Sequence, residues 1–441
     1  MRHARFSLLA ATLLAAALLL SACASRPWPF SAASTTTPAA PPWWQALNDP
    51  ALNDLMATLE GQNLTVQIAV ARLTEAQAQA TAATGALFPR LDVTGNASRG
   101  ERGVPTRTGT LEGGLQANYE VDLFGTTRNT AAAARLRAAQ AAESVADARR
   151  LVRAELAQTV VEQRSRVAEQ ALLQALVSNT QALESLQAEL ARVGLSAPDA
   201  VSQAAAQTAT AQQRLELATA ATAATGFQLA RLLAQSATVV LPAAPMVTPS
   251  PSAVLEVSLT QLQARPDVAA ARLGYLASER DAAAAEAALW PRLTLGAFFG
   301  AQESTAITMP LASNPVWALS AGLTAPVLNF GQLRGAAKAA QARATAATLT
   351  YQETTNRALA EARTALSDYL AGVNAATAAN LAEQRQTAAA ATVAERARRG
   401  LASRLTALNA ANAQLEQALQ TVAAERNARN AYITLWTTLG Q

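Results

Sequence analysis

Side chains that commonly carry out nucleophilic or metal chemistry are scarce in this sequence. The 441 residues contain one cysteine, Cys23, and one histidine, His3. Cys–His and Ser–His–Asp nucleophilic sites require an imidazole, and the usual zinc sites require several Cys or His ligands. We therefore expect no enzymatic activity, no metal site and no cofactor. The chemistry that remains is that of a single thiol.

This thiol ends a segment with the features of an export signal. The apolar run over residues 6–20, about 15 residues long, is too short to cross a bilayer comfortably. The small residues before Cys23 resemble a bacterial lipobox, and Ala24 resembles the next residue of lipoproteins sorted to the outer membrane. We expect residues 1–22 to be a signal peptide and residues 23–45 a linker with lipid attached to Cys23. The alternative is an ordinary signal peptide with an incidental cysteine.

The charge of the chain is nearly balanced, which argues against a nucleic-acid partner. Lys and Arg number 35 against 31 Asp and Glu, and Lys338 is the only lysine. Nucleic-acid-binding chains usually concentrate basic residues in a patch or stripe, whereas here they are dispersed. We expect no nucleic-acid partner.

The elements that would position any functional residue occur twice. Three short segments recur in the same order roughly 200 residues later, a spacing too long for a solenoid repeat. They are residues 88–91 and 290–293 (aromatic-Pro-Arg-Leu), 123–125 and 329–331 (ending in Phe-Gly), and 192–195 and 398–401 (ending in Gly-Leu). We therefore expect two copies of one supersecondary block, over residues 46–236 and 255–441, joined by a Pro-rich linker at residues 237–254.

Each copy contains a very long predicted helix. Residues 126–193 lack Gly and Pro and are rich in Ala, and such a run would form a helix roughly 100 Å long. Residues 336–399 are similar, with Gly372 as the one interruption. Each run ends at a Gly-Leu turn, and we expect return helices at residues 199–236 and about 404–438. Leucines at heptad spacing allow a solvated coiled-coil rod, whereas the abundant Ala favours close packing in the wall of a tube.

The segments before the long helices have the alternation of β-strands. Residues 115–121 alternate apolar and polar side chains, and residues 91–94, 293–297 and 317–321 do so more weakly. We expect two hairpins of strands about nine residues long, the length that crosses a membrane. A soluble two-stranded flap is the alternative. Four strands cannot close a barrel and open edges are not tolerated in lipid, so membrane strands would require several chains, and three would supply twelve strands.

Several segments together make the chain similar to the outer-membrane factor family, the channels of tripartite efflux pumps, in its lipoprotein branch. They are Trp43-Trp44, Asp49-Pro50, Asn63-Leu64, Arg265-Pro266-Asp267-Val268, the paired aromatic-Pro segments and the two Gly-Leu turns. The resemblance implies a mainly α fold with a small β part, assembled as a homotrimer. It also implies a twelve-stranded outer-membrane barrel continuous with a twelve-helix periplasmic tunnel, and a mixed belt built partly by the inter-copy linker and the C-terminal region.

The resemblance also implies partners and sites. The two turns correspond to the periplasmic tips that contact a periplasmic membrane-fusion adaptor. The matching residues are Val193, Gly194, Leu195, Arg399, Gly400 and Leu401. Glycine permits a turn with positive φ and an exposed leucine offers an apolar contact, although a simple helix C-cap explains the same pattern.

Acidic residues that close the aperture in the family lie just past the second tip. The aligned positions here are Thr406 and Asn409, which carry no charge, and the nearest acid of the first copy is Asp199, after Pro198. A neutral polar ring binds divalent cations poorly, so we expect weak cation block.

The function that follows is passive conduction of drugs and other small molecules from an inner-membrane pump of the resistance-nodulation type to the exterior. The expected location is the bacterial outer membrane, with a lipid anchor and a periplasmic extension. Opening would be an iris-like shift of the return helices, stabilised by the adaptor. The alternatives are a channel for type I protein secretion and a structural periplasmic coiled-coil lipoprotein without membrane strands.

Overall fold

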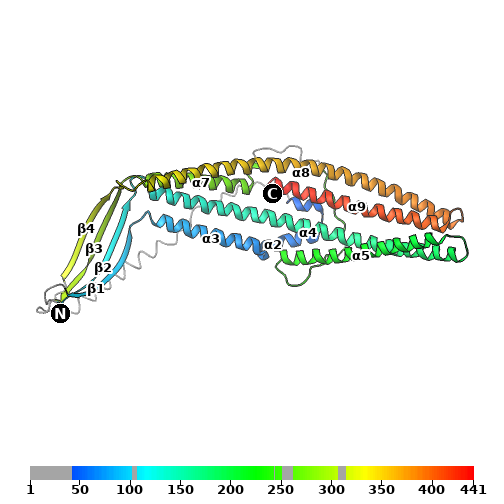
Figure 1. The fold of residues 1–441 in the computed structure, drawn as a ribbon, viewed down its shortest axis with the longest axis horizontal. Coiled ribbons are helices and arrows are strands. Elements are labelled where there is room, and N and C mark those ends of the chain that lie inside the picture. Colours follow the sequence, from blue (N-terminus) through cyan, green and yellow to red (C-terminus); the bar gives the residue numbers. More distant parts are fainter. Residues whose placement is uncertain (1–41, 102–106, 243, 251–261, 306–313) are drawn as a thin grey trace. The chain divides into compact units, whose positions relative to one another are not determined.

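The structure is a computed structural model that describes residues 42–101, 107–242, 244–250, 262–305 and 314–441 (Figure 1). Cys23, the expected signal peptide and most of the expected linker lie outside the described residues. The described chain is mostly helical with one small sheet, which confirms the predicted fold class. Among these residues, no helix combines the length and hydrophobicity needed to span a membrane.

The described elements repeat in order. After the short 3₁₀ helix η1 (Trp43–Leu47) and α2 (Pro50–Gln62), the first series is α3 (Leu64–Gly85), β1 (Arg90–Glu101), β2 (Arg107–Val121), α4 (Thr126–Arg192) and α5 (Pro198–Leu232). The second is α7 (Pro266–Ala287), β3 (Arg292–Thr305), β4 (Asn314–Thr324), α8 (Gln332–Arg398) and α9 (Arg404–Thr438). Corresponding helices have equal lengths of 22, 67 and 35 residues. Helices of 67 residues are stable only when packed along much of their length.

Helix α4 is the central helix of the described chain. It packs against α3, α5, α7 and α9, while α8 packs against α7 and α9, so the two series interlock (Figure 1). Small side chains face the contacts: Ala358, Ala362 and Ala365 of α8 are almost completely buried. Alanine lets helix axes approach closely, which explains why Ala occupies positions where a coiled-coil rod would have leucine.

The four strands form one antiparallel sheet in the order β1-β2-β3-β4. Both predicted hairpins are present, and β2 pairs with β3, which joins the two series in one sheet. The prediction of strands about nine residues long was wrong, because the strands have 12, 15, 14 and 11 residues. The sheet extends into the Gly- and Thr-rich segments that we expected to be connections, since backbone hydrogen bonds to the neighbouring strand stabilise even glycines, whose β propensity is low.

The linker between the two series is bound to the helices by hydrogen bonds. The Gln163 side chain of α4 donates to the carbonyl of Val239 and accepts from the amide of Leu241. Further along, the Tyr369 hydroxyl donates to the carbonyl of Pro249 at 2.8 Å, and Arg429 donates to that of Met246. The main buried cluster lies here and combines residues of η1, α2, α3, α4, α5, α8, α9 and the linker. This is the arrangement that the expected belt requires.

Candidate functional site

The two helical turns have the same backbone geometry. Gly194 and Gly400 have φ of 75° and 76°, in the left-handed region that strains residues with a Cβ. In the first turn, the amide of Leu195 donates to the carbonyl of Leu190 at 2.8 Å, and that of Gly194 to Ala191 at 3.1 Å. The second turn repeats these two bonds from Leu401 and Gly400 with the same lengths. This pattern is the Schellman motif, so both turns are genuine helix C-caps.

The capping hydrogen bonds use backbone atoms only, so the side chains of the turns remain available for contacts with a partner. The Leu195 and Leu401 side chains are each 75% exposed, and Val193 is 61% exposed. In a Schellman motif the residue after the glycine usually packs against the helix, and such exposure shows that it does not do so here. The first turn therefore presents two exposed apolar residues, whereas the second presents one beside Arg399, which is paired with Glu395. Each turn suits an apolar contact with a partner.

The return helices begin differently after the two turns. Pro198 opens α5, and Asp199, which is exposed, lies in its first turn without a side-chain cap at Ala197. In contrast, Ser403 caps α9: its Oγ accepts from the Thr406 amide at 3.0 Å and lies 2.8 Å from the Thr406 Oγ1. Thr406 thus contributes to a helix cap at the turn.

The remaining predicted aperture residue faces a hollow between the two helical hairpins. Asn409 is exposed and lines a cavity of about 440 Å³ with residues of α4, α5 and α9. An ion pair crosses this cavity: the two terminal guanidinium nitrogens of Arg214 in α5 each donate to one carboxylate oxygen of Glu416 in α9, at 2.6 and 3.2 Å. Among the described residues, Asp199 forms no hydrogen bond or ion pair with Thr406 or Asn409.

Sequence reasoning missed the pair between Arg214 and Glu416. Glu416 lies seven residues, or about two helical turns, beyond Asn409, so it is on the same face of α9. A search along that face for the next carboxylate would have found it. The spacing of residues along α9 could not indicate that Arg214 pairs with Glu416, because Arg214 lies 202 positions earlier in the chain.

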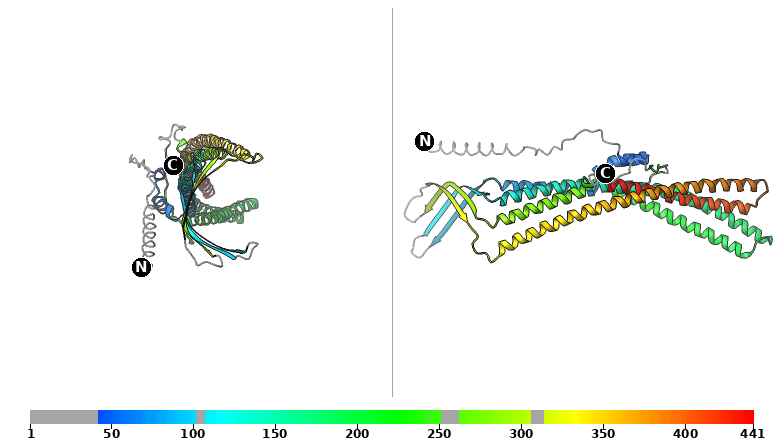
Figure 2. Two further views of the ribbon diagram at one scale, coloured as in Figure 1. Left: turned by 90° about the vertical axis from the view of Figure 1, so that its left-hand side faces the viewer. Right: turned by 90° about the horizontal axis from the view of Figure 1, so that it is seen from above.

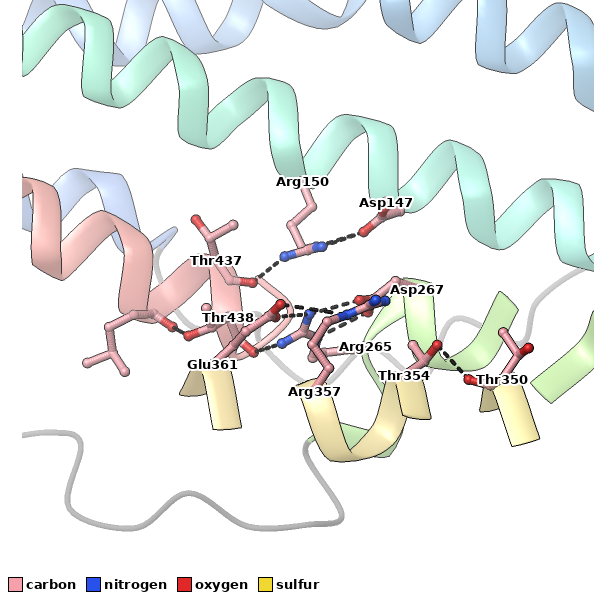
Figure 3. Close-up of polar contacts among 11 residues, drawn as sticks. Asp147, Arg150, Arg265, Asp267, Thr350, Thr354, Arg357, Glu361, Thr437 and Thr438 are labelled. Carbon is pink, nitrogen blue, oxygen red and sulfur yellow. Dashed lines mark hydrogen bonds and ion pairs between the residues drawn. The ribbon is translucent and has the colours of Figure 1, made fainter. Parts of the chain in front are cut away.

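A second polar cluster explains the Arg265-Pro266-Asp267-Val268 segment (Figure 3). Arg265, whose side chain is 4% exposed, binds both carboxylate oxygens of Asp267 at 3.0 and 2.8 Å, and Glu361 of α8 at 3.0 Å. It also donates to the carbonyl of Thr438 at 2.9 Å, and Arg150 of α4 donates to that of Thr437. Arg265 thus satisfies the carbonyl of Thr438 at the end of α9, and Arg150 adds a side-chain donor to the carbonyl of Thr437, which also accepts from the Gly440 amide.

Charge compensation in this cluster shifts two pKa values. Burial alone would raise the pKa of Asp267, but hydrogen bonds and charge from Arg265, together with the charge of Arg150, lower it below its ordinary value. Burial opposes the charge of Arg265 as well, yet its two carboxylate partners raise the pKa of the guanidinium. The cluster therefore joins α4, α7, α8 and the end of α9 through ion pairs and hydrogen bonds.

The sheet has one apolar and one polar face. Because directly paired residues share a face, the register places Val93, Leu115, Phe299 and Trp317 together in one row across the four strands. Val93 is 84% exposed and Trp317 is 71% exposed. Asn96, Glu112 and Gln302 form a row on the opposite face. A soluble flap would not present its apolar face to water, so this face requires an apolar environment.

The profile of a known family covers most of this sequence. The outer membrane efflux protein family matches residues 55–235 and 259–441. The chain belongs to this family. The match confirms the predicted family and, with relatives named as outer membrane proteins, the predicted outer-membrane location.

Relatives and solved structures agree with this assignment. The pyoverdine export outer membrane protein OpmQ of Pseudomonas putida is 30% identical over 68% of this chain and 66% of its own length, and that of Pseudomonas aeruginosa is 28% identical over 81% and 80%. The solved outer-membrane channel OprN has 24% identity and a TM-score of 0.81, over 90% of this chain and 92% of that one. The two segments that match the family lie on either side of the inter-copy linker, and each contains one of the two series of repeated elements.

The described residues show no group of three or more His, Cys, Asp or Glu side chains arranged to hold a metal ion. The family consists of outer membrane efflux proteins. The polar clusters described above consist of arginine–carboxylate pairs and backbone carbonyls, which stabilise the fold.

Proposed function

We propose that three copies of this chain form a passive conduit of a tripartite efflux pump, anchored in the outer membrane by lipid on Cys23. The observation that carries the proposal is the two-faced, open-edged sheet. Its apolar face needs lipid, and β1 and β4 each have one edge without a partner among the described residues. Such edges are not tolerated in a membrane.

Three chains close these edges with a consistent strand direction. Since neighbouring strands are antiparallel, β1 and β4 run in opposite directions, and β4 of one copy can pair antiparallel with β1 of the next. Twelve strands then form a barrel with the polar face inside. The long helices α4 and α8 continue from the strands (Figure 2). In the proposed trimer they form the wall of a tunnel. The four strands contradict the alternative of a coiled-coil lipoprotein without membrane strands.

The tunnel opens, in this proposal, by separation of the two hairpins of each chain near the turns. Arg214 and Glu416 join the α4–α5 and α8–α9 hairpins across the cavity that Asn409 lines. An adaptor that binds the turns and favours the separated arrangement would shift the population toward the open state. Energy for transport comes from an inner-membrane pump of the resistance-nodulation type.

Single-channel recording of the purified trimer in planar bilayers tests the function. We expect detergent-resistant trimers with a steady ohmic conductance that needs no nucleotide. Multivalent cations should block this conductance weakly, because Thr406 and Asn409 carry no charge. Monomers without conductance would contradict the proposal, and strong block that Asp199→Asn removes would place a cation site at the first turn.

Adaptor binding tests the role of the turns. We expect Leu195→Asp and Leu401→Asp each to weaken binding of the periplasmic adaptor by about tenfold or more, because a charge replaces an apolar contact. The thermal unfolding midpoint should not change, since both side chains are exposed. Val240→Asp, at a 63% exposed apolar position outside the turns, is the matched control. Equal loss of binding in the control would contradict the assignment.

A further inference from the structure

The polar face of the sheet contains a hollow that the conduit by itself does not explain. Its volume is about 480 Å³, and residues of all four strands line it, among them Asn96, Glu112, Gln116, Phe298 and Val316. Phe298 contributes the one aromatic ring of the described lining, whose other members are two amides, one hydroxyl, one carboxylate and the apolar residues Val316 and Ala318. The lining contains no basic residue.

Two glycines hold the ring of Phe298 against the sheet. Gly114 of β2 and Gly300 of β3 are directly paired. A Cβ on either glycine would come within 2.8 Å of Phe298 Cζ, and a Cβ on Gly114 would also meet Gly300 Cα at 2.7 Å. The ring therefore occupies the space that two side chains would otherwise fill, and its position depends on both glycines.

The register brings this ring toward Glu112. Phe298 pairs with Gln116, but its Cζ lies over the Gly114–Gly300 pair, which is the next pair on this face in the direction of Glu112. Glu112 lies in the pair after that, opposite Gln302. Glu112 and the ring of Phe298, which lies over the two glycines, thus line a single hollow.

Glu112 is available for a ligand. It forms no ion pair with any residue in the described part of the chain, whereas Asp92, on the same face, binds Arg90 at 2.7 Å. The other carboxylate of this face in β2 is Glu120, eight residues along the strand and roughly 27 Å away. A carboxylate beside an aromatic ring attracts a cation that also has apolar surface, through charge and cation–π contact.

We propose that this hollow is a transient binding station for lipophilic organic cations. The inference rests on the proposed function, because only in the trimer does the polar face become the inner wall of the barrel. Three stations, one from each chain, would then lie around one lumen. They would concentrate cationic aromatic substrates in the exit path without binding them tightly, since the hollow is open to solvent.

Current block by tetraphenylphosphonium measures this binding. We expect it to block the wild-type trimer in planar bilayers in a concentration-dependent way. The blocking constant should weaken about three- to tenfold in Glu112→Gln, which removes the charge, and in Phe298→Leu, which keeps apolar bulk but removes the ring. Triphenylphosphine oxide, a neutral probe of related shape, should block the wild type weakly and should not distinguish the variants.

Glu120→Gln is the matched control, because it removes a carboxylate from the same strand and face outside the hollow. An equal loss of block in this control would contradict the proposed binding site and would indicate a general effect of negative charge in the lumen. Absence of tetraphenylphosphonium block in a wild-type trimer that conducts would also overturn it. Absence of any conductance would instead contradict the proposed function. Unfolding midpoints of the four proteins identify any variant that fails through misfolding.

Discussion

We expect Arg164→Met to lower the free energy of unfolding by about 3–5 kcal/mol, because it leaves the carboxylate of Asp49 buried without its counter-charge. Arg164 of α4 binds both oxygens of Asp49, at 2.9 and 3.1 Å, and the two side chains are 5% and 0% exposed. The same carboxylate accepts from the amide of Leu52 at the start of α2. This contact joins α2 to the central helix α4, beside the ion pair between Arg153 and Glu60.

A double variant distinguishes the contribution of the Asp49–Arg164 ion pair from that of Asp49 as the N-cap of α2. Asp49→Asn keeps a good N-cap residue but leaves Arg164 charged and buried, so we expect a loss of similar size. In Asp49→Asn combined with Arg164→Met, the loss should be clearly smaller than the sum of the single losses. Unfolding in guanidinium, followed by circular dichroism, measures all three variants.

An exposed ion pair between α5 and the same long helix α4 is the control. Arg231 binds Glu155 of α4, but the side chains are 64% and 48% exposed. Water screens such a pair, so Arg231→Met should cost less than about 1 kcal/mol. A cost as large as that of Arg164→Met would show that burial does not control the difference.

The second large effect concerns the cluster at the end of α9. We expect Arg265→Ala to lower the free energy of unfolding by about 3–5 kcal/mol, because Asp267 loses its buried partner and the carbonyl of Thr438 loses its donor. The last turn of α9 should lose protection from amide hydrogen exchange first. Arg357→Ala is the control, since Arg357 is 58% exposed and lies 3.8 Å from Glu361, which Arg265 also binds.

The pH dependence of this loss follows from the lowered pKa of Asp267. A carboxyl with a folded pKa below its unfolded value of about 3.9 stabilises the protein above that pH. This stability disappears as the pH falls through the folded pKa. The difference between wild type and Arg265→Ala should therefore be constant from pH 7 to 5 and decrease below about pH 4. A difference that grows in acid would contradict the assignment.

The shared features of the two copies were predictable because they depend on neighbouring residues. A run without Gly or Pro forms a long helix, and Gly194 and Gly400 end the two runs because glycine readily adopts a positive φ. The return helices begin within a few residues of the predicted positions for the same reason, with Pro198 at a first helical position.

The extent of the strands was not predictable from alternation alone. Residues 108–110 do not alternate apolar and polar side chains, but β1 pairs with all three and β3 pairs with Gly109 and Thr110, so the ladder continues. The sequence of β3 likewise did not indicate that Phe298 would lie over two glycines, because one of them belongs to another strand.

By itself, the sequence determined the duplicated order of elements, the long alanine-rich helices, the two glycine turns and the resemblance to an efflux channel family, since each depends on local composition or on the order of short segments. Only the tertiary structure decided which distant charges meet: Asp49 with Arg164, Arg214 with Glu416, and Arg265 with Glu361. An arginine and a carboxylate attract each other in any sequence order. Which pair forms depends on which helices are packed side by side, and burial then decides how much each pair contributes.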